Sequence, residues 1–505
     1  MRRKWSLSGR LPLPDLNEPL PFPLTLAARK WPDSPALIWE NGRLTYAELE
    51  RLVAGAGLWL RKLGIRPGDR IGLLARNSPE AALLLWAGLF AAVPVVPLNR
   101  RWPRESLRRA GLLADLRVLF ADESSLPLAR ELGLPVEKLE KIWRGASPAS
   151  GISVLEPERE ANILFTSGST GEPKGVRLSV RSHYFNALGS NANLPLGPGQ
   201  GWYAALPFYH VGGLAILYRC ALAGAAAVVA PRFDEEELLA QIRAGRVTHL
   251  SVVPTMLARL LDAGLEKQWP ADSGGILLGG APTPPELLEH LNGTNLPVLT
   301  TYGLTEAASQ VTTLSPADPP EKRKTAGRPL PYRKVRIRRE DGRLAEPGDT
   351  DEIEVSGPVL FSGYLGESKN PSPEDWFATG DLGSLDEQGY LSVRGRKDDL
   401  IISGGENIFP AEIERVALRF PGVRACAAVG VRDAEWGERP LLFVEAGAPE
   451  KFPLARFEAF LRENLPSLYR PERTVVLKQL PRISIGKIDR SRLKRFAPGP
   501  RERNG

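Results

Sequence analysis

The sequence predicts an α/β protein, with a large N-terminal domain of layered α/β subdomains, a β-rich subdomain and a small α+β C-terminal domain. Short β-rich runs alternate with helical segments through the first three quarters of the chain, which is typical of layers around a largely parallel sheet. The length of 505 residues is too great for one compact core. The alternation then restarts near the C-terminus as a smaller unit, which indicates a second domain.

The uncharged segment 81–98 is interpreted as a buried helix over about 79–91 followed by a core strand. A membrane-spanning helix is the alternative, and Pro94 and Pro97 argue against it because they interrupt the segment. Helical spacing also predicts helices at 234–245 and 254–264. Buried strands are predicted at 117–122, 225–231, 248–254 and 296–303.

Strand-like pieces from about Lys334 predict the β-rich subdomain over 334–395, as the last part of an N-terminal domain spanning residues 1–395. The strongest boundary candidate is GRKDD at 395–399, so residues 396–505 form the predicted C-terminal domain. There we expect helices at 411–420 and 454–464, and strands at 425–431 and 439–446.

The composition limits which cellular compartments and which classes of binding partner are expected. The net charge of +7 is modest, and the basic residues are spread without a stripe that carries interleaved aromatics, so nucleic-acid binding is not expected. Cys220 and Cys426 lie far apart in apolar settings, which disfavours a disulfide or a metal site. The N-terminus has no apolar run long enough for a signal peptide. We expect a cytoplasmic protein without a transmembrane span, and a homo-oligomer is compatible with the sequence.

The stretch ILFTSGSTGEPKGV, residues 163–176, places glycines, hydroxyl groups and Lys174 directly after an apolar strand. Glycines allow close backbone approach, and amides, hydroxyls and a cation together suit phosphate oxygens. A Walker A motif cannot be matched around Lys174. From these residues alone, a phosphate-binding loop and an exposed flexible turn both stay open, and a loop of this kind is expected beyond the carboxyl end of a strand.

Six further stretches follow in order: LPFYHVGGL (206–214), LLGGAP (277–282), TYGLTE (301–306), WFATGDLG (376–383), GRKDDLIISGGENIFPAEIE (395–414) and RISIGKIDR (482–490). Together with the glycine-rich loop they resemble the motifs of the adenylate-forming superfamily, which includes acyl-CoA synthetases, luciferases and peptide-synthetase adenylation domains. The resemblance covers nearly the whole chain. It implies an N-terminal AMP-binding domain, a mobile C-terminal domain, and a carboxylate that attacks the α-phosphorus of ATP.

The resemblance also implies roles for single residues around the nucleotide. Lys487 is the expected catalytic lysine, which would reach the α-phosphate and the acid. Glu306 would bind Mg²⁺, because magnesium needs only one or two protein carboxylates beside phosphate oxygens. Asp381 would accept hydrogen bonds from the ribose hydroxyl groups, and Arg396 would contact the ribose or a phosphate. The remaining ATP-binding candidates are Thr166, Ser167, Gly168, Ser169, Thr170, Lys174, Gly280, Ala281, Pro282, Thr301, Tyr302, Gly303 and Thr305.

Without the resemblance, several of these residues have ordinary interpretations. Lys487 reads as a surface lysine, Glu306 as an acid near a helix N-terminus, and Asp381 as a turn residue between glycines. The family match favours the functional interpretation in each case.

The second step, transfer to a thiol, is implied to use a different face of the C-terminal domain. Asp398 occupies the position of the family's hinge, and Gly404 and Gly405 would line a tunnel for the pantetheine arm of coenzyme A. Trp436 would contact CoA, or would pack within the domain. His210 is a further catalytic candidate. It would lie between the acid pocket and this tunnel, where it would gate, orient or, less expected, act as a general base, or it would be a packed histidine bonded to backbone.

The stretches FYHVGGLAILYRCALAG and YGLTEAASQVTTLS resemble the o-succinylbenzoate–CoA ligases of menaquinone synthesis. Their substrate keeps a ring carboxylate, which Arg219 would bind, although a helix arginine that caps or snorkels is the alternative. The acid-binding candidates are His210, Gly212, Gly213, Arg219, Gly279, Ser309 and Thr312.

The expected substrates are ATP with Mg²⁺, CoA and a small carboxylic acid. Other functions stay open: another aryl- or medium-chain acyl-CoA ligase, a stand-alone adenylation enzyme that loads a carrier-protein thiol, or a non-catalytic nucleotide-binding scaffold.

Overall fold

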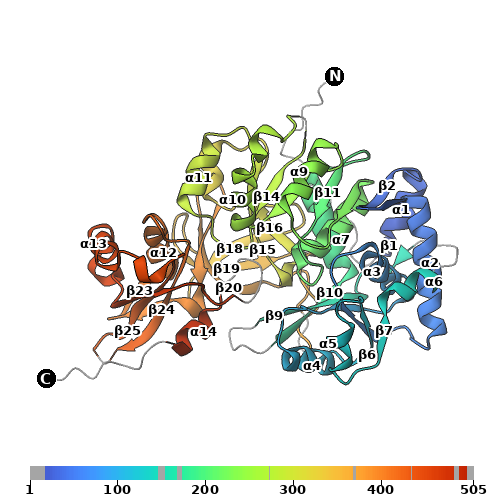
Figure 1. Ribbon diagram of the computed structural model, residues 1–505, viewed down its shortest axis with the longest axis horizontal. Helices are drawn as coiled ribbons and strands as arrows, with labels where there is room; N and C mark the ends of the chain where they lie inside the picture. The colour runs from blue at the N-terminus through green and yellow to red at the C-terminus, as the bar shows by residue number, and fades with distance from the viewer. Residues whose placement is uncertain are drawn as a thin grey trace.

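The α/β class is confirmed by the computed structural model, which describes residues 18–145, 154–167, 173–271, 273–367, 371–433, 435–482 and 488–496. The main body contains three α/β layers and an antiparallel sheet, and the elements after residue 400 form a separate unit at one end of the molecule (Figure 1). No helix of the described residues is long and apolar enough to cross a membrane.

The first large sheet has six strands in the order β10-β9-β5-β4-β6-β7. All neighbours are parallel except β9 and β10, which form an antiparallel hairpin. The strands are β4 (Arg70–Leu74), β5 (Val95–Pro97), β6 (Leu116–Ala121), β7 (Val136–Lys138), β9 (Glu160–Ser167) and β10 (Pro173–Ser179).

A second, four-stranded sheet runs β11-β12-β2-β3, and a five-stranded sheet runs β13-β14-β15-β16-β17. The four-stranded sheet consists of β2 (Pro35–Trp39), β3 (Gly42–Thr45), β11 (Gly201–Ala204) and β12 (Ala226–Val229). The five-stranded sheet consists of β13 (Leu250–Val252), β14 (Ile276–Leu278), β15 (Val298–Leu304), β16 (Ser309–Thr313) and β17 (Arg328–Pro329). A short antiparallel pair, β1 (Leu20–Pro21) and β8 (Val154–Leu155), lies apart from these sheets.

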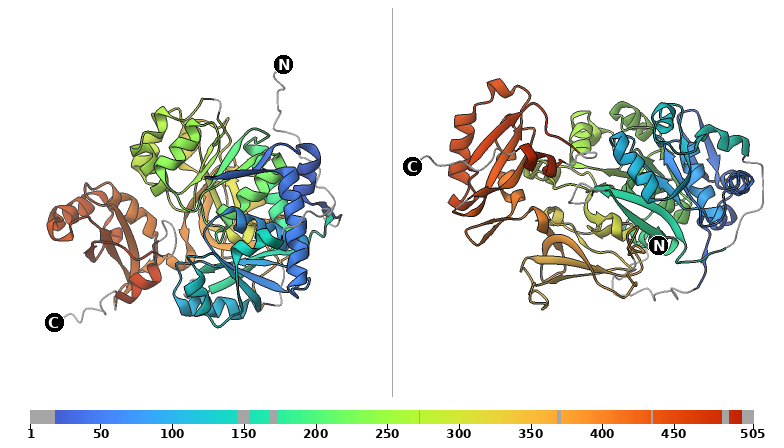
Figure 2. Two further views of the ribbon diagram at one scale, coloured as in Figure 1. Left: turned by 45° about the vertical axis from the view of Figure 1, so that its right-hand side comes forward. Right: turned by 90° about the horizontal axis from the view of Figure 1, so that it is seen from below.

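Helices of the main body connect and cover these strands (Figures 1 and 2). They are α1 (Pro23–Lys30), α2 (Tyr46–Lys62), α3 (Pro79–Ala91), α4 (Arg104–Leu113), α5 (Leu126–Arg130), α6 (Ile142–Gly145), α7 (Val180–Asn193), α8 (Val211–Ala223), α9 (Glu235–Arg243), α10 (Pro254–Asp262) and α11 (Pro285–Asn292). The predicted helix over 79–91 is confirmed as α3, and β5 follows it as the predicted core strand. Ser78 caps α3, and nearly every residue of this helix is buried, as its uniformly apolar sequence requires.

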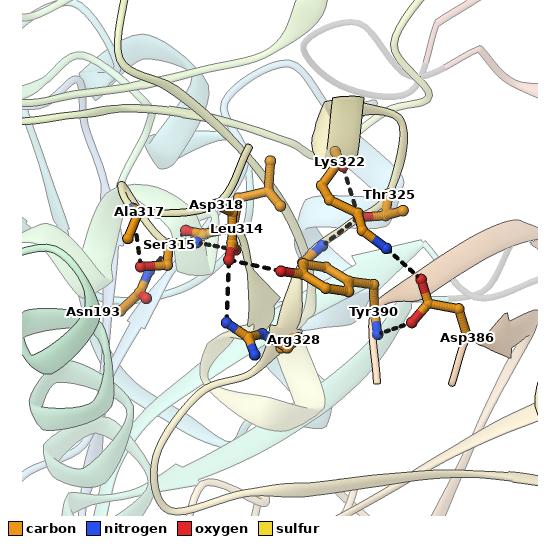
Figure 3. A network of polar contacts seen from close by, with 11 residues as sticks. Asn193, Leu314, Ser315, Ala317, Asp318, Lys322, Thr325, Arg328, Asp386 and Tyr390 are labelled. Carbon is orange, nitrogen blue, oxygen red and sulfur yellow. Dashed lines mark hydrogen bonds and ion pairs between the residues drawn. The ribbon is translucent and has the colours of Figure 1, made fainter. Parts of the chain in front are cut away.

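The predicted β-rich subdomain is an antiparallel sheet of β18 (Lys334–Arg338), β19 (Asp351–Ser356), β20 (Phe377–Leu385) and β21 (Leu391–Arg396). A polar network ties it to the five-stranded sheet (Figure 3). Asp318 Oδ1 accepts hydrogen bonds from Tyr390 Oη (2.7 Å) and Arg328 Nη2 (3.1 Å), while Lys322 Nζ donates to Asp386 Oδ2 (2.8 Å). These contacts fix the two sheets that carry the candidate nucleotide-binding residues.

The unit after residue 400 contains one sheet, β23-β22-β25-β24 with β26 beside β25, and three helices. Its elements are β22 (Ile401–Ser403), β23 (Glu406–Ile408), α12 (Pro410–Leu418), β24 (Ala425–Asp433), β25 (Gly437–Glu445), α13 (Leu454–Asn464), β26 (Arg473–Leu477) and α14 (Arg490–Phe496). The expected helices and strands of this unit are all present. The domain limits at 395/396 and the mobility of the unit stay predictions.

Two motifs lie partly on strands, and for the second the strand agrees with the one predicted at 296–303. In the phosphate-loop motif, β9 extends through Thr166 and Ser167, and Lys174 is already part of β10. In TYGLTE, residues 301–304 form the end of β15, because antiparallel pairing with β16 prolongs the strand beyond its parallel pairing with β14.

Candidate active site

Glu306 lies at the centre of three segments that the fold brings together. It occupies a 3-10 turn, Thr305–Ala307, directly after β15. Tyr364 Oη donates a hydrogen bond to Glu306 Oε1 (2.8 Å), and Phe361 N donates to the Glu306 carbonyl (2.8 Å). Lys174 Nζ lies 5.5 Å from the centroid of the Tyr364 ring, within the range of a cation–π contact. Tyr364 therefore joins the candidate magnesium ligand to the phosphate-loop lysine.

The segment around Tyr364 is itself held against the phosphate-loop hairpin. Val176 and Tyr364 form an antiparallel bridge, and Leu365 N donates to the Gly175 carbonyl (2.8 Å). A Cβ at Gly175 would lie 2.5 Å from Leu365 Cδ1, so this close approach requires glycine. Thr166 stands opposite Lys174 in the hairpin register. Sequence reasoning did not find Tyr364, because its role follows from a contact across 58 sequence positions.

Asp381 is held by two partners on neighbouring strands. Tyr302 Oη donates to Asp381 Oδ2 (2.6 Å), and Arg396 Nη1 donates to Asp381 Oδ1 (2.9 Å). The pairing of β20 with β21 places Asp381 directly opposite Arg396. Burial, together with the Asp381 charge, raises the pKa of Tyr302 well above its usual range. Tyr302 thus stays a proton donor, and the carboxylate is fixed in one orientation.

The Arg396 charge is also shared with a second carboxylate. Burial alone lowers the pKa of Arg396, but the nearby Asp381 and Glu306 outweigh burial, so the pKa is raised. Two acids, one guanidinium and the Lys174 ammonium therefore face the same region, as a nucleotide with its phosphates requires. In the described residues, no group of three or more His, Cys, Asp or Glu side chains is arranged so that it could hold a metal ion. A magnesium ion that also binds phosphate oxygens needs only one or two protein carboxylates, so Glu306 alone would suffice to hold it.

The candidate adenine-binding segment follows β14 and packs on β15. A Cβ at Gly279 would lie 2.7 Å from Thr301 Cγ2, so packing against Thr301 accounts for this glycine, which the sequence assigned to the acid. Gly280 has a φ of +79°, a conformation that glycine adopts easily. Thr301 Oγ1 is engaged within the sheet, by the Thr312 carbonyl (2.9 Å) and by Thr313 Oγ1 (2.8 Å). Ala281 is half-buried and Pro282 is exposed beyond them.

Gly303 makes room for the irregular start of β16. A Cβ at Gly303 would lie 2.1 Å from the Ser309 carbonyl oxygen, at the point where the β15–β16 register shifts. Ala308 and Ser309 both have positive φ, 54° and 126°. Such backbone is strained for residues with a side chain and is concentrated at functional sites. The strained turn directs Ser309 toward α8.

His210 is the N-cap residue of α8, and its ring packs edge-on against Tyr209 at 4.6 Å. The two glycines that follow differ. A Cβ at Gly213 would lie 2.2 Å from the Leu206 carbonyl oxygen, so the chain itself takes up the space expected for a substrate ring. A Cβ at Gly212 would have only Leu206 within 4 Å among the described residues. Space for an acid beside this helix is therefore expected at Gly212.

Arg219 lies two turns further along α8 and is 1% exposed. Its Nη2 donates to Ser309 Oγ (3.0 Å), and its guanidinium stacks 5.1 Å from the Trp202 ring centroid. Burial lowers the pKa of Arg219 to about 10, so the side chain stays charged at neutral pH. Arg219 Nε and the nearby Thr312 Oγ1 have no hydrogen-bond partner among the described residues. The interpretation of Arg219 as a capping or snorkelling arginine is wrong, because such a side chain would reach solvent.

In the unit after residue 400, Gly404 and Gly405 form the turn between β22 and β23. Both have positive φ, 58° and 84°, as a two-residue hairpin turn demands. A Cβ at Gly404 would lie 2.7 Å from the Trp436 ring, and that ring is 40% exposed. An exposed indole above a glycine turn is compatible with the predicted contact to CoA. Asp398 is exposed in the 3-10 turn Lys397–Asp399.

Arg490 connects this turn to the end of the lysine motif. Its guanidinium forms a bidentate pair with Glu414 (2.6 and 2.9 Å) and lies 3.5 Å from Asp399 Oδ2. Lys487, three residues earlier, is outside the described residues, as are Gly168, Ser169, Thr170 and the side chain of Ser167. The described candidate residues therefore form two groups. One group lies around Glu306 and Asp381, and the other lies around Arg219.

Comparison with known proteins agrees with this arrangement. Residues 24–365 match the family model of the AMP-binding enzymes, and residues 412–487 match that of the AMP-binding enzyme C-terminal domain. The 2-succinylbenzoate–CoA ligase of Bacillus licheniformis is 35% identical over 92% of this chain and 97% of its own length. The ligase of the same name from Oceanobacillus iheyensis is 34% identical over 95% of this chain and all of its own.

Solved structures show the same similarity. The o-succinylbenzoate CoA synthetase MenE from Bacillus subtilis, in complex with the acyl-adenylate intermediate OSB-AMP, has a TM-score of 0.87 and 33% identity over 94% of this chain and 98% of that one. ATP-bound MatB from Rhodopseudomonas palustris has a TM-score of 0.84 and 28% identity over 94% of this chain and 99% of that one. The chain belongs to the AMP-binding enzyme family.

Proposed function

We propose that this protein is an ATP-dependent, AMP-forming acid–CoA ligase whose acid is o-succinylbenzoate. Membership of the AMP-binding enzymes and the similarity to 2-succinylbenzoate–CoA ligases over nearly the whole chain support the reaction class. In the first step, an oxygen of the succinyl carboxylate attacks the α-phosphorus of ATP. The bond from that phosphorus to the bridging oxygen breaks, and pyrophosphate leaves.

The charged residues described above fit this step. Asp381, fixed by Tyr302 and Arg396, offers paired acceptors to the ribose hydroxyls. Lys174 and Thr166 face each other across the hairpin and would hold the β- and γ-phosphates. When bound at Glu306, Mg²⁺ supplies positive charge to the phosphate oxygens that become pyrophosphate. Lys487 would stabilise the charge that develops at the α-phosphorus and orient the acid.

In the second step, the CoA thiol sulfur attacks the carbonyl carbon of the acyl-adenylate. AMP leaves as the C–O bond breaks, the thiol proton passes to solvent, and the products are o-succinylbenzoyl-CoA and AMP. Trp436 and the Gly404–Gly405 turn are the proposed CoA contacts, and Asp398 is the proposed hinge.

The observation that carries the choice of acid is Arg219. A buried guanidinium without a carboxylate partner among the described residues is costly unless a ligand provides the anion. Its contact with Ser309, on the strand that follows the Glu306 turn, supports a position of this charge near the proposed nucleotide site. The ring carboxylate of o-succinylbenzoate, which does not react, matches it directly or through water.

The test is an assay of purified protein with ATP, Mg²⁺ and CoA against a panel of acids. The panel contains o-succinylbenzoate, 4-oxo-4-phenylbutanoate (the same acid without the ring carboxylate), a fatty acid and an amino acid. We expect AMP, pyrophosphate and the acyl-CoA mass with o-succinylbenzoate above all others. A clear preference for acids that lack the second carboxylate would overturn the proposal and favour another aryl- or medium-chain ligase. Adenylate formation without transfer to CoA would indicate an enzyme that loads a carrier protein.

A cytoplasmic location is part of this proposal. Cys220 and Cys426 are both buried free thiols, which suits a reducing compartment.

A further inference from the structure

A second buried arginine, Arg333, lies behind the strand that contacts Arg219. It stands between β17 and β18 and is 6% exposed. Its Nη1 donates to the Gln310 carbonyl, its Nε to the Pro331 carbonyl (3.1 Å) and its Nη2 to the Phe185 carbonyl (3.4 Å). All these acceptors are backbone carbonyls. Arg333 therefore connects α7 and β16 with the β-rich subdomain, yet none of these bonds neutralises its charge.

Neither Arg219 nor Arg333 has an Asp or Glu partner among the described residues. Burial lowers the pKa of Arg219 to about 10 and that of Arg333 to about 9, with the charge on Arg219 as a second cause for Arg333. Both stay protonated at neutral pH. Arg219 binds Ser309 and Arg333 binds the carbonyl of the adjacent Gln310, so two buried positive charges contact neighbouring residues of one strand. Arg181 on α7 shows how a buried arginine is usually compensated. It is 1% exposed and pairs with the carboxylate of Glu158.

The Arg333 side chain packs closely against α7 at Gly189. A Cβ at Gly189 would lie 2.1 Å from Arg333 Nη2 and 2.6 Å from the Pro331 carbonyl oxygen. Glycine inside a helix costs ~0.5–1 kcal/mol relative to alanine. Gly189, within α7, is thus explained by the Pro331 backbone carbonyl together with the guanidinium that crosses it.

Unsatisfied polar groups surround the same layer between α7, α8 and β16. Each of them is a buried side-chain atom that lacks a hydrogen-bond partner among the described residues. They are Asn186 Oδ1, Ser190 Oγ, Arg219 Nε, Gln310 Oε1 and Thr312 Oγ1. Buried polar atoms are normally satisfied, so a group of them beside two unpaired cations calls for a polar ligand or bound water.

We propose that Arg333 is a specificity-determining residue, whose buried charge adds to that of Arg219 and makes the acid site select a dicarboxylate over a monocarboxylate. Arg333 acts on the acid without touching it. Its positive charge attracts the second carboxylate, and its hydrogen bond to the Gln310 carbonyl positions β16, while Arg219 lies nearer to the acid. In a region from which water is largely excluded, a second cation at such a distance is only weakly screened. The inference rests on the proposed function and names the feature that sets its substrate class.

The experiment compares Arg333→Gln and Arg333→Lys with the wild type, using o-succinylbenzoate and 4-oxo-4-phenylbutanoate. For Arg333→Gln we expect the KM for o-succinylbenzoate to rise about tenfold, while the KM for the monocarboxylate changes less than about twofold. Lysine keeps the charge but cannot reproduce the fork of hydrogen bonds, so Arg333→Lys should stay within about threefold of the wild type for both acids. The matched control is Arg336→Gln on β18, which removes a cation paired with Glu354 (2.6 Å) and should not change the KM ratio.

A second variant keeps the test informative if Arg333→Gln does not fold. Gln310→Glu is nearly isosteric and places a carboxylate on the residue whose carbonyl Arg333 binds. We expect it to raise the KM for the dicarboxylate and to leave that of the monocarboxylate unchanged, because a buried carboxylate in this layer would offset part of the positive charge of the two arginines.

Equal losses for both acids in Arg333→Gln and Arg333→Lys would make Arg333 a structural residue and overturn the inference. An unchanged KM ratio in both Arg333→Gln and Gln310→Glu would do the same. A wild-type enzyme that does not use o-succinylbenzoate at all would contradict the proposed function itself, which separates the two failures.

Discussion

The two halves of the proposed site differ in how their charges are compensated. Around the nucleotide, Glu306 and Asp381 each have a tyrosine donor, and Arg396 already pairs with Asp381. Around the acid, Arg219 and Arg333 are buried without a carboxylate among the described residues. In the first half, the described charged residues are thus held by partners within the protein. The second half, as proposed, is completed by the charge of the substrate.

This difference predicts two kinds of variant. Changes near the nucleotide should slow the reaction with every acid, because all acids share the same phosphoryl chemistry. Changes near Arg219 should alter which acid is used, because they act only on the part of the substrate that does not react.

The largest effect is expected for Lys487→Ala. Loss of the cation that is proposed to act at the α-phosphate should slow acyl-adenylate formation about a thousandfold for every acid. Thioester formation from pre-made acyl-adenylate should stay within about threefold of the wild type, because in the second step the lysine has no phosphoryl charge to stabilise. Single-turnover measurement of each step gives the answer, and equal losses in both steps would contradict this division.

Arg219→Met should come next, and it should act on one class of acid. The KM for o-succinylbenzoate is expected to rise about thirtyfold, since one partner of a buried charge pair is lost. The KM for 4-oxo-4-phenylbutanoate should stay unchanged or fall, because a buried unpaired charge has been removed. Steady-state kinetics with both acids checks this, and a rise of equal size for both would return Arg219 to a packing role.

Tyr364→Phe should have a smaller effect, confined to the nucleotide half. Losing the hydrogen bond to Glu306 should raise the KM for Mg·ATP about fivefold, without changing the preference between acids. Calorimetric titration of ATP with and without Mg²⁺ should place the loss in the magnesium-dependent part of binding.

Tyr390→Phe is the matched control for Tyr364→Phe. It removes another tyrosine hydroxyl bonded to a carboxylate, at 2.7 Å from Asp318, in the polar network between the antiparallel and the five-stranded sheet (Figure 3). If both variants lowered ATP binding equally, the role of Tyr364 would be one of general stability.

Gly189→Ala is expected to have the smallest effect, on stability. The added methyl group would collide with Arg333 Nη2 and with the Pro331 carbonyl, so unfolding free energy should fall by about 1–2 kcal/mol despite the better helix propensity of alanine. Thermal unfolding measures it, with Gly197→Ala as the control, since a Cβ there meets nothing within 4 Å. An unchanged Tm for Gly189→Ala would mean that both the guanidinium and the Pro331 carbonyl move aside readily.

The nucleotide half could be predicted from sequence more fully than the acid half. Its residues lie in short ordered motifs, and the expected helices and strands around them were confirmed. Tyr364 could not be predicted, because no sequence motif around it indicates a role in the site. Its importance comes from a strand-like bridge between segments far apart in the chain.

The acid half depends on burial, which the local sequence does not reveal. Arg333 lies in the segment PYRKVRIRR, whose many basic residues are typical of an exposed strand. For Arg219, the local sequence is equally compatible with a side chain that reaches solvent. Only the packing of α7, α8 and β16 shows that both are enclosed. Gly213 illustrates the reverse case, since the space that it leaves is taken up by the protein's own backbone.

A crystal structure with a non-hydrolysable mimic of o-succinylbenzoyl-AMP tests the central claim most directly. The account predicts that the ring carboxylate lies within hydrogen-bond distance of Arg219, or one water away, in the layer between α8 and β16. A ring carboxylate that faces solvent, with Arg219 still bonded only to Ser309, would contradict it.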